Sequence, residues 1–222
     1  MHLTFAEEFL LLALDDRGRF VEIPPMALEY GLAGALLMEL SLGNHIDSDL
    51  KKLYIVNPSP TGDALLDDTL RQLHGEEQTI KYWVKELPNR LPELRERVVN
   101  RLVSHGILKK EEHKVLWVFS SRRYPCIDNH EEEEVLRRIR RTVLEDDIPD
   151  PRDIVLISLV FACDLVEEIF AERERAKAYD RIAEISKMDL IGQAVNTAVQ
   201  ELNRLVASAV SSVSTIANPV RV

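Results

Sequence analysis

The most constraining feature of this sequence is a long stretch, from residue 26 to residue 42, that is apolar on nearly every side. The double proline Pro24-Pro25 precedes it and Gly43-Asn44 follows it, which is typical of a helix start and a helix end. Its large and small apolar residues cover most of the helical circumference, at Leu28, Leu32, Ala35, Leu36, Leu37 and Leu40. Such a helix has to be surrounded by other elements, so we expect it at the centre of the fold.

The segments that would surround this helix are themselves helical and mostly amphipathic. Thr4 and Glu7 have the spacing of a capping box, which predicts a helix start close to the N-terminus. Leu94, Val98 and Leu102 lie along one face of a helix predicted from residue 93 to residue 105. Further helices are predicted over residues 61–73, 79–86, 131–145, 150–170 and 173–186, and after residue 189.

Two short segments have the character of β-strands. Leu53 to Val56 is one candidate, and Lys114 to Ser120 is the strongest strand signal, which Ile107-Leu108 could complete as a hairpin. No long Gly/Ser-rich or Pro-rich stretch divides the chain, so we expect residues 1–222 to form a single domain. The predicted fold is mainly α, a compact bundle of apolar helices ringed by amphipathic helices, with one or two small β-hairpins.

The net charge and the distribution of apolar residues indicate which partners the protein can bind and in which cellular compartment we expect it. Lys and Arg number 28 and Asp and Glu 38, a net charge of -10, whereas broad binding to nucleic acid uses a wide cationic surface. We therefore expect no nucleic-acid partner. No basic region precedes the apolar N-terminal stretch, which argues against a signal peptide, and the longest uncharged run, residues 205–220, is shorter than the about 20 apolar residues of a spanning helix. With two cysteines, we expect a cytoplasmic protein whose membrane contact is peripheral.

The sequence contains no recognisable catalytic motif. A phosphate-cradling glycine loop, HExxH, CxxC and a nucleophile elbow are all absent, and no two histidines lie four residues apart. Asp63 and Asp67 stand one helical turn apart and could share Mg²⁺. Asp63 after Thr61-Gly62 is equally typical of a helix cap, with Asp67 in the first turn, and we favour that interpretation. We expect no catalytic residue, no metal and no cofactor.

Arginines and a histidine cluster in the middle of the chain. Arg97, Arg101 and His105 follow one another at four-residue spacing and form one stripe, whereas Arg95 points about 160° away from Arg97. Guanidinium groups suit phosphate because their donors are planar and bidentate. Charge runs usually mark an exposed face, and Glu93 stands four residues before Arg97, so the residues alone favour local ion pairs over an anion pocket.

The apolar strand candidate has two alternative environments. Residues 115–119 are apolar at every position, so the strand is either covered on both faces or exposes one of them. If it is exposed, Leu116, Trp117, Val118 and Phe119 would form a surface for membrane insertion or self-association. If it is covered, helices sandwich it, and the pattern does not separate the two.

A repeated pattern supports an alternative function. Residues 36–56 and 98–119 each run from an apolar helix through a glycine turn to a short strand, the order of a recognition helix and wing in winged-helix proteins. The alternative hypothesis is a protein-interaction or DNA-binding regulator with winged-helix-like units. Helix–glycine–strand units are common, so this hypothesis comes second.

Several sequence blocks follow one another in an order that points to a known family. They are LTFAEEFLLL at residues 3–12, GLAGALLMEL at 31–40, PTGDALLDD at 60–68, RERVVNRLV at 95–103 with GIL at 106–108, and ACDLVE at 162–167 leading to Phe170. Together they resemble the Golgi phosphoprotein 3 family over nearly the whole chain, and the PTGDxLLD block is the most diagnostic.

The resemblance implies a compact helical domain with a protruding apolar hairpin, here about residues 108–121. Members of this family are peripheral membrane proteins that bind phosphatidylinositol 4-phosphate in a basic pocket and act as adaptors for the cytosolic tails of Golgi glycosyltransferases. What it implies is therefore a non-enzymatic adaptor on the cytosolic membrane face, with anionic lipid headgroups and protein tails as partners and homo-oligomers formed through the hairpin. The chain begins at the domain itself, so we expect a prokaryote-like member without the N-terminal extension of eukaryotic members.

The lipid pocket of the family is only partly preserved in this sequence. Its tryptophan, the arginine of its GLxG segment and two arginines three residues apart fall on Pro24, Ala33, Pro92 and Arg95. Only Arg95 matches, and each missing charge-assisted bond is worth about 1.5–3 kcal/mol. The resemblance thus implies a reduced basic pocket, with Arg95 as the headgroup contact and Arg97 and Arg90 as assistants.

Overall fold

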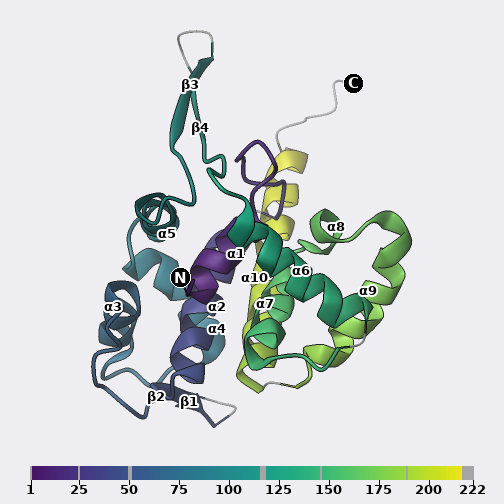
Figure 1. Ribbon diagram of the computed structural model, residues 1–222. Helices are drawn as coiled ribbons and strands as arrows, with labels where there is room; N and C mark the ends of the chain where they lie inside the picture. Colours follow the sequence, from purple (N-terminus) through teal and green to yellow (C-terminus); the bar gives the residue numbers. More distant parts are fainter. Residues whose placement is uncertain are drawn as a thin grey trace.

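The computed structural model of the protein describes residues 2–24, 26–49, 52–115, 119–145, 147–188 and 190–216, in which helices pack around a central one (Figure 1). The helices are α1 (Phe5–Leu12), α2 (Ala27–Leu42), α3 (Ala64–Leu73), α4 (Ile80–Arg90), α5 (Leu94–Ser104), α6 (His130–Leu144), α7 (Pro151–Ala162), α8 (Val166–Ile169), α9 (Glu172–Ile185) and α10 (Leu190–Ile216). The strands are β1 (Ile46–Ser48), β2 (Leu53–Ile55), β3 (Glu111–Val115) and β4 (Phe119–Arg123). The predicted fold class, mainly α with small β-hairpins, is confirmed.

Helix α2 lies at the centre, as its all-round apolar pattern predicts. Of its 16 residues, 12 are buried, and it packs against α1, α4, α5, α7 and α10. Its two carboxylates, Glu29 and Glu39, are half-buried near the two ends of the helix, where each pairs with an arginine. The helix begins at Ala27, later than predicted, because Met26 has a left-handed φ of 67°.

Helices α1 and α7 approach α2 closely at Gly31. A Cβ atom at this position would lie 2.4 Å from Phe9 Cζ and 2.8 Å from Cys163 Sγ, so only glycine fits without displacement. The Cys163 thiol donates to the carbonyl of Ala27 at 3.3 Å. Burial raises the pKa of this thiol, which is typical of a structural cysteine rather than a reactive one.

The two hairpins differ from the predicted strand pairing in one respect. β1 pairs with β2 in antiparallel register, Asp47 opposite Tyr54. The second hairpin folds within the strong strand signal itself, so that β3 pairs with β4 and Val115 lies opposite Phe119. The predicted pairing with Ile107-Leu108 is wrong, because Leu108 instead bridges Cys126 below the hairpin. Opposite charges face each other across the β3–β4 register, as Glu111–Arg123 and Glu112–Arg122, an arrangement that favours it.

Two helix ends also differ from prediction. The helix predicted to run to Phe170 stops at Ala162, because Asp164 adopts a left-handed φ of 63° and α8 then starts anew at Val166. Helix α4 continues past Pro88 to Arg90, although it was predicted to end before this proline. Pro88 lies in the last turn, where its missing N–H costs the helix only one hydrogen bond.

Candidate functional site

Two aspartates of the PTGDALLDD block stabilise the first turn of α3 through hydrogen bonds. Asp63 accepts hydrogen bonds from the backbone N–H groups of Leu65 and Leu66 at 2.8 and 3.1 Å, which confirms the helix-cap interpretation. Asp67 accepts from the backbone N–H and hydroxyl of Thr61 at 2.7 and 2.8 Å. These hydrogen bonds hold the pKa of Asp67 below its usual range. Both carboxylates thus have protein donors as partners.

The predicted stripe on α5 faces α1 and α3. Arg101 bonds to Asp63 Oδ2 at 2.5 Å and to Glu7 Oε1 at 3.2 Å, and His105 Nδ1 lies 3.3 Å from the same Glu7 oxygen. Arg97 pairs with Asp68 of α3; among the described residues, its predicted pair with Glu93 does not form. Residues of three sequence blocks, 3–12, 60–68 and 95–103, therefore meet in an ion-pair network that ties α1, α3 and α5 together.

Arg90, predicted to assist headgroup binding, is held at the end of α4. Its guanidinium makes two hydrogen bonds to the carboxylate of Glu76, at 2.8 and 3.1 Å, and a third to the hydroxyl of Tyr82 at 2.8 Å. It also stacks over the Trp83 ring at 5.0 Å. The hydrogen bonds from Arg90 hold the pKa of Glu76 below its usual value.

Arg95, predicted as the main headgroup contact, is held more loosely than Arg90. Its Nη1 atom lies 3.4 Å from Glu29 Oε1, at the start of α2, and its guanidinium lies over the Phe20 ring at 5.3 Å. The Phe20 ring packs in turn against Tyr124, with centroids 5.7 Å apart. The three predicted arginines thus have three different carboxylate partners: Glu76, Glu29 and Asp68.

The other positions predicted for the lipid pocket carry apolar side chains. Ala33 is fully buried within α2, Pro24 is half-buried before it, and Pro92 is exposed in the turn before α5. Sequence reasoning missed Phe20 and Glu29, because each meets Arg95 only through the tertiary fold. The local sequence around Phe20 shows an aromatic residue beside a turn, which does not indicate a contact with Arg95.

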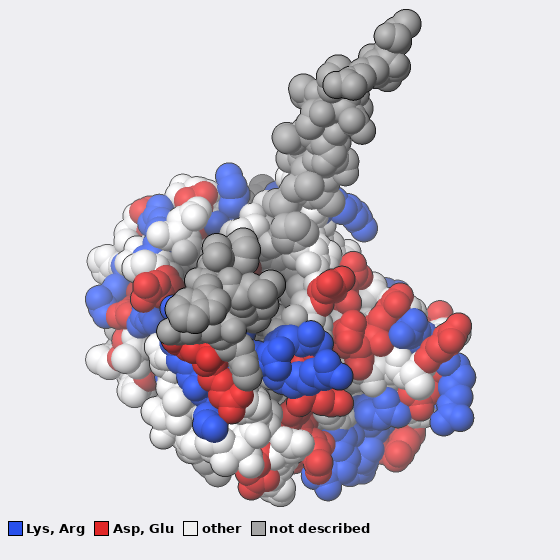
Figure 2. All heavy atoms as spheres, turned by 90° about the horizontal axis from the view of Figure 1, so that it is seen from above, with Lys and Arg blue, Asp and Glu red and all other residues white. Residues whose placement is uncertain are grey.

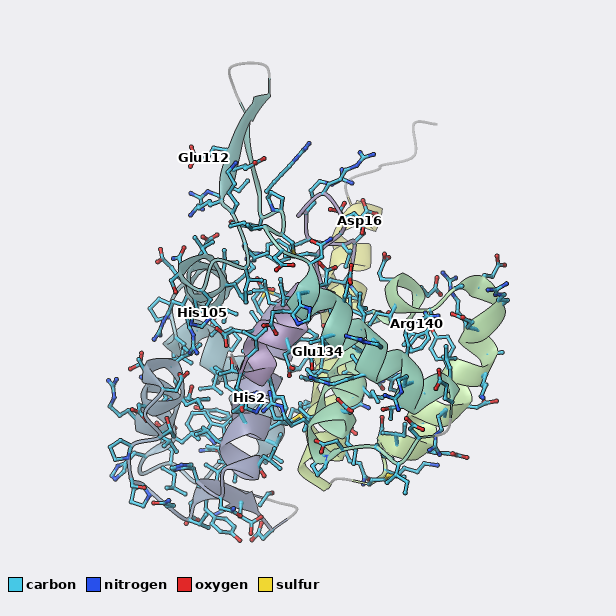
Figure 3. All side chains as sticks on the ribbon, viewed as in Figure 1. His2, Asp16, His105, Glu112, Glu134 and Arg140 are labelled. Carbon is cyan, nitrogen blue, oxygen red and sulfur yellow. The ribbon has the colours of Figure 1, made fainter. Side chains whose placement is uncertain are left out.

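The β3–β4 hairpin projects from the helical body (Figure 1), and Glu112 on it lies well away from the helices (Figure 3). Its base is tied to Glu96 of α5, which receives the hydroxyl of Tyr124 at 3.1 Å and the guanidinium of Arg122 at 3.4 Å. Lys110 Nζ also lies 3.5 Å from this carboxylate. Of the predicted apolar tip, Leu116, Trp117 and Val118 lie outside the described residues, and Phe119 is described by its backbone alone.

The surface around this end carries charges of both signs. Lys and Arg side chains alternate with Asp and Glu over the face in Figure 2, without one wide basic area. Among the described helices, none combines the length and the apolar character needed to cross a bilayer.

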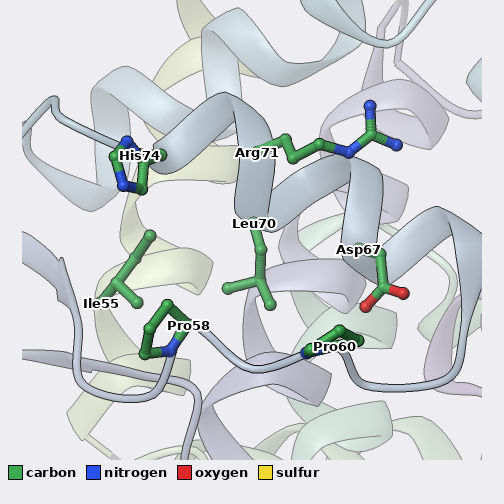
Figure 4. A pocket seen from close by; sticks show the side chains of 7 residues that line it. All are labelled: Ile55, Pro58, Pro60, Asp67, Leu70, Arg71 and His74. Atoms are coloured by element: carbon green, nitrogen blue, oxygen red, sulfur yellow. The ribbon is translucent and has the colours of Figure 1, made fainter.

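A separate hollow of about 660 Å³ lies between α3 and the segment after β2 (Figure 4). Leu70 forms its floor, and Ile55, Pro58 and Pro60 form the opposite wall. His74 stands at one end and Asp67 at the other, but the Asp67 carboxylate is already bound by Thr61. The hollow is mainly apolar, and its side chains make no arrangement of nucleophile and base.

Comparisons with known proteins place this geometry in a family context. The family model described as Golgi phosphoprotein 3 (GPP34) matches residues 5–202. Vacuolar protein sorting-associated protein 74 of Eremothecium gossypii is 31% identical over 159 residues, which cover 62% of this chain and 48% of that protein. The chain thus spans about half the length of the curated relative it matches.

Proposed function

This chain belongs to the Golgi phosphoprotein 3 (GPP34) family, and from this premise we propose that it is a non-enzymatic, adaptor-type protein that binds membranes peripherally. Its lipid ligands are phosphatidylinositol 4-phosphate or other anionic headgroups, and its protein partners are the cytosolic tails of membrane proteins. The family match, over residues 5–202, includes both Arg95 and the hairpin. We place the protein on the cytosolic face of a membrane.

The exposure and the loose pairing of the Arg95 side chain are the observations that support lipid binding. Its side chain is 43% exposed, compared with 27% for Arg90 and 32% for Arg97. Arg90 is held by three hydrogen bonds and Arg97 by Asp68, whereas among the described residues the carboxylate contact of Arg95 is the loose one with Glu29, beside its stacking on Phe20. An exposed guanidinium without a hydrogen-bonded carboxylate retains donors for phosphate. The reduced pocket is therefore centred on Arg95, and Arg90 and Arg97 act mainly through the fold.

The hairpin supports the same orientation toward a membrane. Tyr124, directly after β4, packs on Phe20, and the Arg95 guanidinium lies over the same Phe20 ring. The hairpin base and the arginine therefore occupy one end of the protein. A headgroup at Arg95 and a hairpin tip in the interface can thus be engaged together. In this proposal residues 116–119 insert into the lipid surface or pair with a second copy of the chain.

The alternative DNA-binding function has less support. The helix-then-hairpin order of both predicted winged-helix units is present, as α2 with β1–β2 and α5 with β3–β4. A recognition helix must expose side chains to the major groove. Helix α2 is buried on nearly every side, and Arg97 and Arg101 of α5 are paired with aspartates. Helix α2 carries no Lys or Arg, and of the three arginines on α5 Arg95 alone lacks a hydrogen-bonded carboxylate among the described residues, which is one cation rather than a basic face.

Vesicle co-sedimentation at low salt tests the proposed function. Wild type is expected to pellet with phosphatidylcholine vesicles containing phosphatidylinositol 4-phosphate and to pellet less with phosphatidylcholine alone. Arg95→Ala is expected to weaken the lipid-dependent binding at least about tenfold, since a charge-assisted hydrogen bond contributes about 1.5–3 kcal/mol. Arg175→Ala is the matched control, because Arg175 is 32% exposed and pairs with Glu167 elsewhere on the surface. Equal pelleting of Arg95→Ala and wild type, or no lipid dependence for either, would overturn the proposal.

A further inference from the structure

The contact between Glu29 and Arg95 is unusual among the ion pairs of the neighbouring arginines. Its N–O distance of 3.4 Å exceeds the about 2.7–2.9 Å of a charge-assisted hydrogen bond. The Glu29 side chain, in the first turn of α2, is 27% exposed and the Arg95 side chain beside it is 43% exposed, so solvent reaches both. By comparison, Arg101 meets Asp63 at 2.5 Å. Glu29 therefore lies beside Arg95 without holding it firmly.

A phosphate that binds Arg95 is repelled by the Glu29 carboxylate. The two anions would share one guanidinium within a few ångströms, and like charges at that separation repel each other. The backbone of Glu29 is fixed in α2, so only its side chain can turn away, and Phe20 covers one face of the Arg95 guanidinium. A bound phosphate must displace the Glu29 side chain toward solvent. As long as Glu29 stays near Arg95, the phosphate loses part of the attraction of that guanidinium.

From this geometry we infer that Glu29 is an internal competitor for the phosphate of the ligand at Arg95, and that it sets the affinity of the site. The inference rests on the proposed function, since it concerns the same arginine. It assigns to Glu29 a specificity-determining position that the charge pattern of the chain alone does not reveal. The ligand class is a phosphate-bearing anion, and Glu29 repels an anion more strongly the more negative charge that anion carries.

The variant Glu29→Gln keeps the size of the side chain and removes its charge. Its affinity for vesicles containing phosphatidylinositol 4-phosphate is expected to rise about two- to fivefold, the range that exposed ion pairs contribute. The gain should shrink at high salt, where exposed charges are screened. A parallel titration with inorganic phosphate, followed through the chemical shift of the Arg95 side chain, separates the sources. A gain with vesicles alone assigns the site to a lipid headgroup, and a gain with both assigns it to phosphate in general.

The matched control is Glu167→Gln, which makes the same charge change beside Arg175, away from the site. An equal gain in this control would overturn the inference, because the effect would then be one of net charge. A gain from Glu29→Gln in an Arg95→Ala background would overturn it as well. If wild type binds, Arg95→Ala does not and Glu29→Gln binds no tighter, the inference fails and the proposed function stands. If neither wild type nor Glu29→Gln binds any vesicle, both fail.

Discussion

Replacing Arg152 by leucine is expected to lower the free energy of unfolding by about 3–5 kcal/mol, the usual cost of removing one partner from a buried ion pair. Arg152 Nη2 bonds to Glu8 Oε2 at 2.9 Å and to the carbonyl of Leu3 at 2.8 Å. Its Nη1 meets Glu39 Oε1 at 3.2 Å, and the guanidinium stacks on Phe5 at 4.2 Å. Since Glu8 is only 3% exposed, the variant would leave buried carboxylates without this cation.

The loss in Arg152→Leu should depend on pH. Burial raises the pKa of Glu39 above its usual value even in the presence of Arg152, whose charge lowers it. Removing the arginine raises this folded-state pKa further. A carboxyl whose folded pKa exceeds its unfolded pKa loses its stabilising contribution as pH rises through the folded value. The deficit should therefore be largest near neutral pH and should decrease as pH falls toward about 4.

Urea unfolding at both pH values measures this effect, with Arg175→Leu as the control. Arg175 also bonds a glutamate and a backbone carbonyl, but its partner Glu167 is 62% exposed, so a loss of at most about 1 kcal/mol is expected. A deficit in Arg152→Leu no larger than that of the control would contradict the structural role assigned to this network.

The second large effect is expected from Gly31→Val. In a helix interior valine is less unfavourable than glycine, which is about 1 kcal/mol less favourable than alanine, so helix propensity alone predicts a slightly stabilised protein. The structure predicts the opposite, because the new Cβ would lie 2.4 Å from Phe9 Cζ and 2.8 Å from Cys163 Sγ, both fully buried. Overpacking of this kind costs about 1–3 kcal/mol or more.

Thermal unfolding compares this variant with Gly43→Ala, at the other end of α2. There a new Cβ would lie 3.2 Å from Cδ2 of His45 and 3.3 Å from the carbonyl oxygen of Glu39, contacts that a shift of a few tenths of an ångström relieves. We expect a change within about 1 kcal/mol for Gly43→Ala. A Gly31→Val protein that melts at or above the wild-type temperature would show that α1 and α7 do not approach α2 as described.

Features that depend on neighbouring residues could be predicted from the sequence. The capping box of Thr4 with Glu7 and the cap at Asp63 involve residues two or three apart, and both are present. The central place of α2 followed from its apolar circumference, which only burial satisfies. The break after α7 could not be predicted in this way, since it depends on the left-handed conformation of Asp164, a residue that usually adopts other conformations.

The candidate site was less predictable, because its contacts join distant parts of the chain. The i, i+4 rule pointed Arg97 toward Glu93, but the tertiary fold brings Asp68 to it instead. Arg95 was identified through the family resemblance and not by its charge pattern. Its neighbours Phe20 and Glu29 come from the loop before α2 and from α2 itself, so only the packing of α5 against these elements brings them together.

The most direct test of this account is a parallel vesicle-binding measurement on Arg90→Ala, Arg95→Ala and Arg97→Ala, each first shown to be folded by circular dichroism. The three arginines are equivalent in charge, but only Arg95 lacks a hydrogen-bonded carboxylate among the residues that the structure describes. Arg95→Ala alone is expected to lose binding to phosphatidylinositol 4-phosphate vesicles, while the other two variants lose stability and keep their affinity. A folded Arg90→Ala or Arg97→Ala that loses as much affinity as Arg95→Ala would contradict it.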